Sequence, residues 1–272
     1  MSEPMRLLDT GPMSARRNVA IAAALAELHR AGQSPDTLRL CVYPRAVLVG
    51  SDQRPTDVVR VKACRRYHVE IAHRMTDGVA VYMSPGILAW DVVTERHRFG
   101  NRLGEVSERI CSGLAAGLAR FGLPARFRPF DEVEIGGRRI SQSHGWVDGP
   151  TAVFQGAVLV DIDLVDMDAI LRSPAARNEA RSSLITPVTS LAEWLGRVPP
   201  MDEVKRLLIA GLAHSWHCEF QPGSLAPPEL KLADRLLDEG FATESFADAP
   251  VAAAAAAERR AATSARMGVR AP

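Results

Sequence analysis

This chain of 272 residues has little excess of charge and no long apolar segment. Its 33 basic and 32 acidic residues give a formal net charge of +1, which excludes a global attraction for nucleic acid or an anionic membrane. No segment approaches the roughly 20 apolar residues of a membrane-spanning helix, and the N-terminal segment has no apolar core typical of signal peptides. We therefore predict a cytoplasmic protein without a nucleic-acid or membrane partner.

Cysteine is also scarce. The four cysteines are scattered and form no Cys-x-x-Cys pair; they are Cys41, Cys64, Cys111 and Cys218. This pattern indicates neither a disulfide framework nor a zinc ribbon. His214 and His217 can share a helix face next to Cys218, but the spacing places no fourth zinc ligand. We therefore predict buried thiols and a packed helix end, without a metal site.

The apolar residues that are present follow clear periods. Residues that recur every three or four positions predict helices at 14–31, 57–69, 102–121, 190–196, 201–217 and 228–240. Alternation predicts strands at 37–43, 46–53, 87–93 and 151–164 and a hairpin at 131–145 that turns at Gly136-Gly137. The first two strands are expected to pair with each other. Because strands and helices are grouped in blocks, we predict an α+β fold in which mixed or antiparallel sheets are packed with helices.

Two short segments combine arginine with a turn. In HRMTDGVAVYMSPG (73–86), Gly78 allows close approach of the backbone to a ligand, and successive N–H groups of such a turn can hold an anion. Arg74 adds a planar cation suited to carboxylate or phosphate. Two further arginines, 138 and 139, point to opposite faces of one strand. The alternatives are a plain hairpin with a surface arginine and two solvated arginines on an edge strand.

Six motifs follow one another in a recognisable order. They are NVAIAAAL (18–25), a strand that ends in Gly50 and Gln53, the segment 73–86, Phe130-Asp131 followed by Gly137–Ser143, Gln155–Leu159, and VTSL (188–191). This order resembles the lipoate-protein ligase A and octanoyltransferase family, relatives of biotin-protein ligases, over about residues 5–215. The family pattern includes Arg-Arg-x-Thr-Gly-Gly-Gly-Ala-Val-Tyr, Gly-x-Lys-Ile-Ser-Gly-Ser and His-Gly-x-Leu-Leu.

The resemblance implies a fold and a division of the chain. The fold is the catalytic domain shared by class II aminoacyl-tRNA synthetases and biotin and lipoate ligases, here expected at residues 1–198. A helical C-terminal extension (199–242) would correspond to a reduced accessory domain, so that a separate accessory subunit is an open alternative. The Ala-rich tail (243–272) is expected to be flexible.

The resemblance also implies an activity: ATP with Mg²⁺ would activate lipoate or octanoate as the acyl-adenylate, and the acyl group would pass to a lysine of a lipoyl carrier domain. Arg139, at the position of the family's lysine, would neutralise charge that develops on the acyl-phosphate oxygens. Asp131 would contact the attacking amine or a metal. The substrate and nucleotide would be bound by Arg74, Thr76, Asp77, Gly78, Val79, Ala80, Ser141, Gln155 and Gly156.

The departures from the family pattern that bear most on activity are at Arg139, Asp77 and Val79. Arg139 keeps the positive charge of the lysine, but its high pKa makes it a poor proton donor. Asp77 and Val79 replace glycines. A carboxylate about 4 Å from another unit negative charge costs about 4 kcal/mol at an effective dielectric of 20. Asp77 therefore points away from the nucleotide or holds magnesium, for which Asp131 is a second candidate, or the ligand is not ATP.

Two other functions stay open from the sequence. The departures are compatible with a catalytically degenerate module that binds an acyl group or a carrier as the partner of another subunit. An octanoyltransferase needs a thiolate in the acyl tunnel. None of the four cysteines falls where the family's nucleophile is expected, so the ligase is the preferred interpretation.

Overall fold

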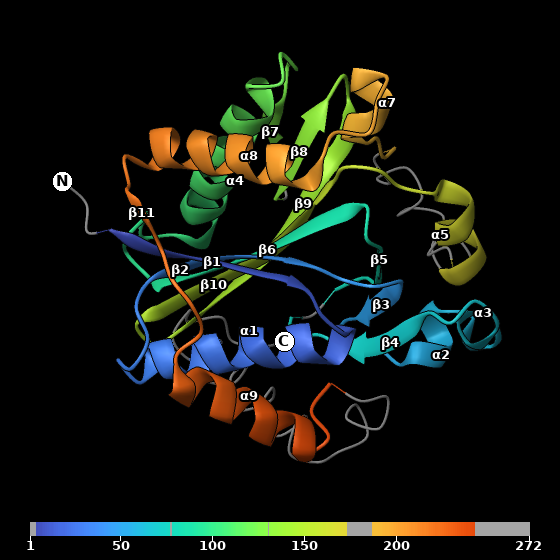
Figure 1. Ribbon diagram of the computed structural model, residues 1–272, viewed down its shortest axis with the longest axis horizontal. Coiled ribbons are helices and arrows are strands. Elements are labelled where there is room, and N and C mark those ends of the chain that lie inside the picture. Colours follow the sequence, from blue (N-terminus) through green and yellow to red (C-terminus); the bar gives the residue numbers. More distant parts are fainter. Residues whose placement is uncertain (1–3, 77, 130, 173–186, 243–272) are drawn as a thin grey trace, which may run out of the picture.

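The computed structural model describes residues 4–76, 78–129, 131–172 and 187–242, which form two β-sheets flanked by helices (Figure 1). The eight-stranded sheet has the order β11-β1-β2-β6-β10-β9-β8-β7, and the three-stranded sheet has the order β4-β3-β5. The strands are β1 (Met5–Pro12), β2 (Thr37–Val42), β3 (Ala46–Val49), β4 (Glu70–His73), β5 (Val81–Met83), β6 (Ile87–Glu95), β7 (Arg126–Arg128), β8 (Glu132–Ile135), β9 (Arg138–Asp148), β10 (Thr151–Leu159) and β11 (Phe220–Pro222).

Helices cover both faces of the large sheet (Figure 1). They are α1 (Ala15–Arg30), α2 (Pro55–Val58), α3 (Val61–Arg66), α4 (Leu103–Ala119), α5 (Leu164–Ile170), α7 (Leu191–Leu195), α8 (Met201–Trp216) and α9 (Pro227–Asp238). Helices α4 and α8 pack against each other and bury Ile110, Leu114 and Leu208 in the main core. Helices α1 and α9 pack together on the opposite face. The mixed α+β architecture predicted from the sequence is confirmed.

Alternation along β6 explains how this sheet serves two cores. Leu88, Trp90 and Val92 belong to the core beneath α4 and α8. Ala89 and Asp91 lie on the other face, toward the small sheet and α1, because successive side chains of a strand point to opposite sides. The second face therefore carries polar side chains into the interior, and the candidate site lies there.

Most of the predicted elements are present, with several differences. The single helix predicted at 57–69 is wrong: the structure has two short helices, α2 and α3, which are separated where Val59 forms a β-bridge with Leu171. Strand β1 was not predicted, because the apolar residues of its sequence, MRLLDTGP, do not alternate, and the three-residue strands β7 and β11 were not predicted either. The predicted pairing of the strands at 37–43 and 46–53 is wrong: β2 pairs with β1 and β6, whereas β3 pairs with β4 and β5 in the other sheet. Apolar alternation identifies a strand, but long-range packing selects its partners.

Residues 199–242 extend the same layers. Helix α8 packs on α4, β11 adds a parallel edge strand to β1, and α9 packs on α1. The boundary predicted at residue 198 stays a prediction, and the predicted tail, 243–272, lies outside the described residues. None of the described helices is long and apolar enough to cross a membrane.

Candidate functional site

A cavity of about 160 Å³ lies between the two sheets. Its walls come from β6, β9 and β10 of the large sheet, from β3 and β5 of the small sheet, and from α1 and α5. The apolar part of the lining comprises Val19, Leu48, Val81, Met83, Ala89, Ala157, Leu159, Ile162, Met167 and Leu171. These side chains offer no hydrogen bonds, so this part of the cavity suits an alkyl chain.

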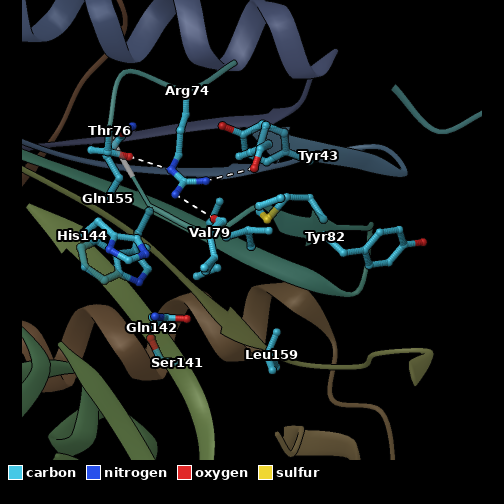
Figure 2. A pocket seen from close by; sticks show the side chains of 18 of the residues that line it. Tyr43, Arg74, Thr76, Val79, Tyr82, Ser141, Gln142, His144, Gln155 and Leu159 are labelled. Atoms are coloured by element: carbon cyan, nitrogen blue, oxygen red, sulfur yellow. Dashed lines mark hydrogen bonds between the residues drawn. The ribbon is translucent and has the colours of Figure 1, made fainter. Parts of the chain in front are cut away.

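A second part of the lining is polar and positively charged. It comprises Arg74, Thr76, Asp91, Arg139, Ser141, Gln142, His144 and Gln155. Figure 2 shows Arg74, Thr76, His144 and Gln142 on one side of the cavity, with Leu159 farther along it. The cavity therefore joins an apolar chamber to a polar head region that contains two arginines, an arrangement suited to an acyl chain that ends in a carboxylate or carbonyl.

Arg74 is buried, and its hydrogen bonds hold the loop that follows β4. Its Nε donates to the Thr76 hydroxyl over 2.8 Å, its Nη1 to the Leu48 carbonyl over 3.0 Å, and its Nη2 to the Val79 carbonyl over 2.9 Å (Figure 2). Arg74 thus shapes the loop in addition to placing a positive charge at the cavity.

The loop at 74–80 is also tied to the segment that follows β3. The Ser51 N–H donates to the Thr76 carbonyl over 3.1 Å, and the Gly78 N–H donates to Oδ1 of Asp52 over 3.1 Å. A Cβ on Gly50 would lie 2.1 Å from the Gly78 carbonyl oxygen, so the close approach of the two segments requires glycine there. A backbone N–H that was predicted to hold an anion is therefore already bonded to a carboxylate.

A second buried arginine lies beneath the cavity. Arg39 is fully buried and forms an ion pair with Asp91, with Nη1 3.0 Å from Oδ2. Oδ1 of Asp91 accepts a hydrogen bond of 2.7 Å from Nε2 of Gln155. A carboxylate accepts but does not donate, so this bond fixes the Gln155 amide group with its nitrogen toward Asp91. We call Arg39, Asp91 and Gln155 the Asp91 network.

Arg139 lines the cavity from β9 and forms an ion pair with Glu132 on β8, at 3.0 Å. The backbone of Arg139 is also fixed, because its N–H donates to the Pro187 carbonyl and its carbonyl accepts from Thr189. The segment of the predicted VTSL motif therefore supports the strand that carries Arg139. The Glu132 carboxylate partly neutralises the arginine, so Arg139 reaches the cavity as one partner of an ion pair.

Asp131 lies beside β9, where its carbonyl accepts a hydrogen bond of 2.8 Å from the Ser143 N–H. It has a left-handed backbone conformation (φ 66°), and its carboxylate accepts a hydrogen bond from Ser107 on α4. It is absent from the residues that line the cavity. Asp77 lies outside the described residues, so the question that its charge raises stays a prediction.

The other predicted substrate residues line the cavity, and one of them also serves packing. Thr76, Val79, Ala80, Ser141 and Gln155 line the cavity. Gly156 also lines it, but its lack of a side chain serves packing: a Cβ there would lie 2.3 Å from Cζ2 of Trp90 and 2.7 Å from the Gln142 carbonyl oxygen. The close contact with Trp90 therefore requires glycine at this position.

None of the four cysteines lines the cavity, and all four are buried. Burial raises the pKa of the Cys41 thiol to about 12 and that of the Cys111 thiol to about 11. Neither of these two thiols is therefore ionised appreciably at neutral pH. In the described part of the chain, no group of three or more His, Cys, Asp or Glu side chains could hold a metal ion, so His214, His217 and Cys218 form no such group.

His144 is a cavity residue that sequence reasoning missed. Burial and, after it, the positive charges of Arg74 and Arg139 together lower the pKa of its imidazole to about 4, against an opposing effect of the Asp131 carboxylate. The ring is therefore neutral at pH 7. Its position two residues after Gln142, on the same face of β9, was the only available signal, and it could be interpreted only once the cavity was known.

Residues 14–213 match the family model described as the lipoyl protein ligase A/B catalytic domain. The chain belongs to this family. The resemblance inferred from the motifs is thereby confirmed, since the lipoyl protein ligase A/B match covers most of the chain and includes every residue that lines the cavity.

Individual relatives carry two different names. The chain is 28% identical to the octanoyltransferase LipM of Symbiobacterium thermophilum, over 90% of this chain and 98% of that protein. It is 25% identical to lipoate-protein ligase A subunit 1 of Thermoplasma acidophilum, over 90% of this chain and 96% of that protein. A solved structure of the bi-partite lipoate protein ligase of T. acidophilum superposes with a TM-score of 0.78 at 23% identity, covering 90% of this chain and 96% of that one. The structural likeness supports the fold.

Proposed function

We propose that this protein binds an octanoyl or lipoyl group in the cavity between the two sheets and transfers it to a lysine of a lipoyl carrier domain. The observation that carries this proposal is the apolar chamber that ends in a polar region with Arg74, Arg139 and His144. Membership of the lipoyl protein ligase A/B family supports it, as do relatives named for octanoyl transfer and lipoate ligation.

We further propose that ATP with Mg²⁺ activates the acid. A carboxylate oxygen of the acid attacks the α-phosphorus of ATP and pyrophosphate leaves; the lysine amine then attacks the acyl carbonyl carbon and AMP leaves. Arg139 stabilises the negative charge that develops on the acyl-phosphate oxygens, as a fixed cation at the cavity. The Asp52 carboxylate has to leave the Gly78 N–H before a phosphate can accept that hydrogen bond.

Transfer through a cysteine thioester has less support. That route needs a thiolate within reach of the acyl carbonyl, and no cysteine lines the cavity. The names of the LipM relatives nevertheless make an octanoyl thioester a donor that the assay has to include.

The second candidate function is acyl binding without activation, as the partner of another subunit. The Arg139–Glu132 ion pair and the hydrogen bond from Gly78 to Asp52 favour it, because each occupies a group that the ATP-dependent reaction would use. The name of the Thermoplasma relative, a ligase subunit, is compatible with this role.

The test measures acylation of a lipoyl domain by intact-mass spectrometry. One reaction contains octanoate with ATP and Mg²⁺, and the other contains octanoyl acyl-carrier protein without ATP. We expect a mass increase of one octanoyl group in the first reaction. Product only in the second reaction would replace the ATP-dependent route, and octanoate binding without product in either would favour the second candidate. Absence of both acylation and acyl binding would overturn the proposal.

Arg139 provides an internal comparison in the same assay. Arg139→Met is expected to lower the rate by roughly 100-fold, because it removes the cation beside the reacting oxygens, whereas Arg139→Lys keeps the charge. Arg126→Met is the matched control, since Arg126 also pairs with a glutamate of β8 but lies outside the cavity lining. Equal effects at Arg139 and Arg126 would contradict the role of Arg139.

A further inference from the structure

The hydrogen-bonding capacity of the polar head region is unevenly used. Arg74 donates from Nε, Nη1 and Nη2 to protein acceptors, and Arg139 is paired with Glu132. In contrast, Nε2 of His144 is buried and has no hydrogen-bond partner in the described structure. A buried polar atom without a partner costs free energy, so its presence beside a cavity points to a ligand.

The position of His144 brings its ring next to Arg74. A Cβ built on Gly78 would lie 3.3 Å from Nη2 of Arg74 and 3.7 Å from Cε1 of His144, so both side chains meet at this glycine. In Figure 2, His144 lies between Arg74 and Gln142 along the cavity wall. Gln155, the cross-strand neighbour of His144, is held by Asp91.

We propose that His144 is a specificity-determining residue of the acyl site and donates a hydrogen bond from its ring to an oxygen of the acyl head group. This inference rests on the proposed acyl-binding function and identifies the group that recognises the head. A neutral imidazole has one N–H donor and one acceptor nitrogen, so it can donate to a carboxylate or to a carbonyl. The two neighbouring arginines make the anion the preferred occupant of this corner.

A bound carboxylate has a second consequence, because it is a negative charge beside the imidazole. The charged groups that act on His144 are Arg74 and Arg139, which disfavour the imidazolium, and Asp131, which favours it. Asp91 lies behind Gln155 on the neighbouring strands and is already paired with Arg39. A ligand carboxylate would counter the two arginines, so we expect the pKa of His144 to rise from about 4 when octanoate binds.

The experiment measures octanoate and octanamide binding by calorimetry and the ring protonation of His144 by NMR, with full-length protein. We expect His144→Leu to weaken octanoate binding about tenfold and octanamide binding less, since hydrogen bonds to charged groups are the stronger ones. His144→Gln retains an N–H donor and is expected to retain most of the affinity. His97→Ala is the matched control, because His97 is exposed, its ring contacts the neighbouring Asn101, and its backbone N–H donates to the Glu95 carboxylate.

Each outcome decides the inference. Equal loss for octanoate and octanamide, wild-type affinity of His144→Leu, or a His144 pKa that does not move on saturation with octanoate would overturn it, while acyl binding itself would stand. If the wild-type protein binds neither ligand, the proposed function fails together with this inference. Thermal unfolding of each variant confirms that a loss of affinity is not a loss of fold.

Discussion

The Asp91 network and His144 lie side by side on the same face of the large sheet, since Gln155 of the network is the cross-strand neighbour of His144, yet they differ in how completely their polar atoms are hydrogen-bonded. Both partners of the Arg39–Asp91 ion pair are almost fully buried, and Gln155 satisfies the second carboxylate oxygen. Nε2 of His144, one strand away, is buried and has no hydrogen-bond partner among the residues that the structure describes. The same sheet thus carries a fully hydrogen-bonded network that stabilises the fold and a histidine with an unused hydrogen-bonding atom that a ligand can bind.

The largest expected effect on stability comes from disrupting the Asp91 network. Asp91→Ala leaves Arg39 as a buried, unpaired cation and is expected to lower the free energy of unfolding by about 3–5 kcal/mol. Urea denaturation measures the loss. The control is Asp9→Ala, because Asp9 forms an ion pair with Lys205 but is half exposed, and less than about 1 kcal/mol is expected. Similar losses at the two positions would contradict the structural role of the Asp91 network.

A second, smaller effect is expected next to Gln155 on β10. Gly156→Ala places a methyl group against Trp90 and is expected to destabilise the protein by about 1–3 kcal/mol. Gly104→Ala on α4 is the matched control, since nothing lies within 4 Å of a Cβ there and alanine favours helices. We expect the control to be neutral or slightly stabilising. A Gly156→Ala variant as stable as the control would show that Trp90 does not pack on β10 in this way.

His144 should also make the stability of the protein depend on pH. The folded-state pKa of His144, about 4, lies below the unfolded value of roughly 6.5, so the unfolded chain binds a proton that the folded chain excludes. The resulting stability is fully present above the unfolded pKa and is lost as the pH falls from about 6.5 toward 4. Thermal unfolding of wild type and His144→Gln across this range is the measurement. Parallel pH profiles for the two proteins would contradict the depressed pKa.

The smallest expected effect is at the cysteines. Cys111→Ser removes a thiol that is buried on α4, outside the cavity lining, and is expected to leave the rate of acyl transfer unchanged. The same result is expected for Cys41, Cys64 and Cys218. Intact-mass spectrometry of the lipoyl domain gives the rates. A loss of transfer in one of these variants, with thermal stability retained, would reinstate the thioester route.

The sequence predicted the elements whose signals are local. Helix α4 was predicted within one or two residues at each end because its apolar residues recur at helical spacing, and the start predicted for the first helix, residue 14, is the residue that caps α1. The hairpin between β8 and β9 follows from the Gly136-Gly137 turn. Residues of the motifs at 74–80 and 139–141 line one cavity, and their role in binding substrate or nucleotide stays a prediction.

The features that could not be predicted from the sequence depend on contacts between residues far apart in the chain. Arg39 and Asp91 are 52 positions apart, and no sequence pattern indicates that they form an ion pair beneath the cavity. The apolar sequence of strand β3 is compatible with a place in either sheet, so its partner strands could not be predicted. His144 had no identifiable partner in the sequence, since its environment consists of Arg74, Arg139 and the cavity wall, which the fold assembles.

A crystal structure of the protein with octanoate tests the central claim most directly. The account predicts that the alkyl chain lies among Val81, Met83 and Leu159, with the carboxylate within hydrogen-bonding distance of His144. Octanoate bound outside the cavity, or bound within it with the carboxylate among these apolar side chains, would contradict the account.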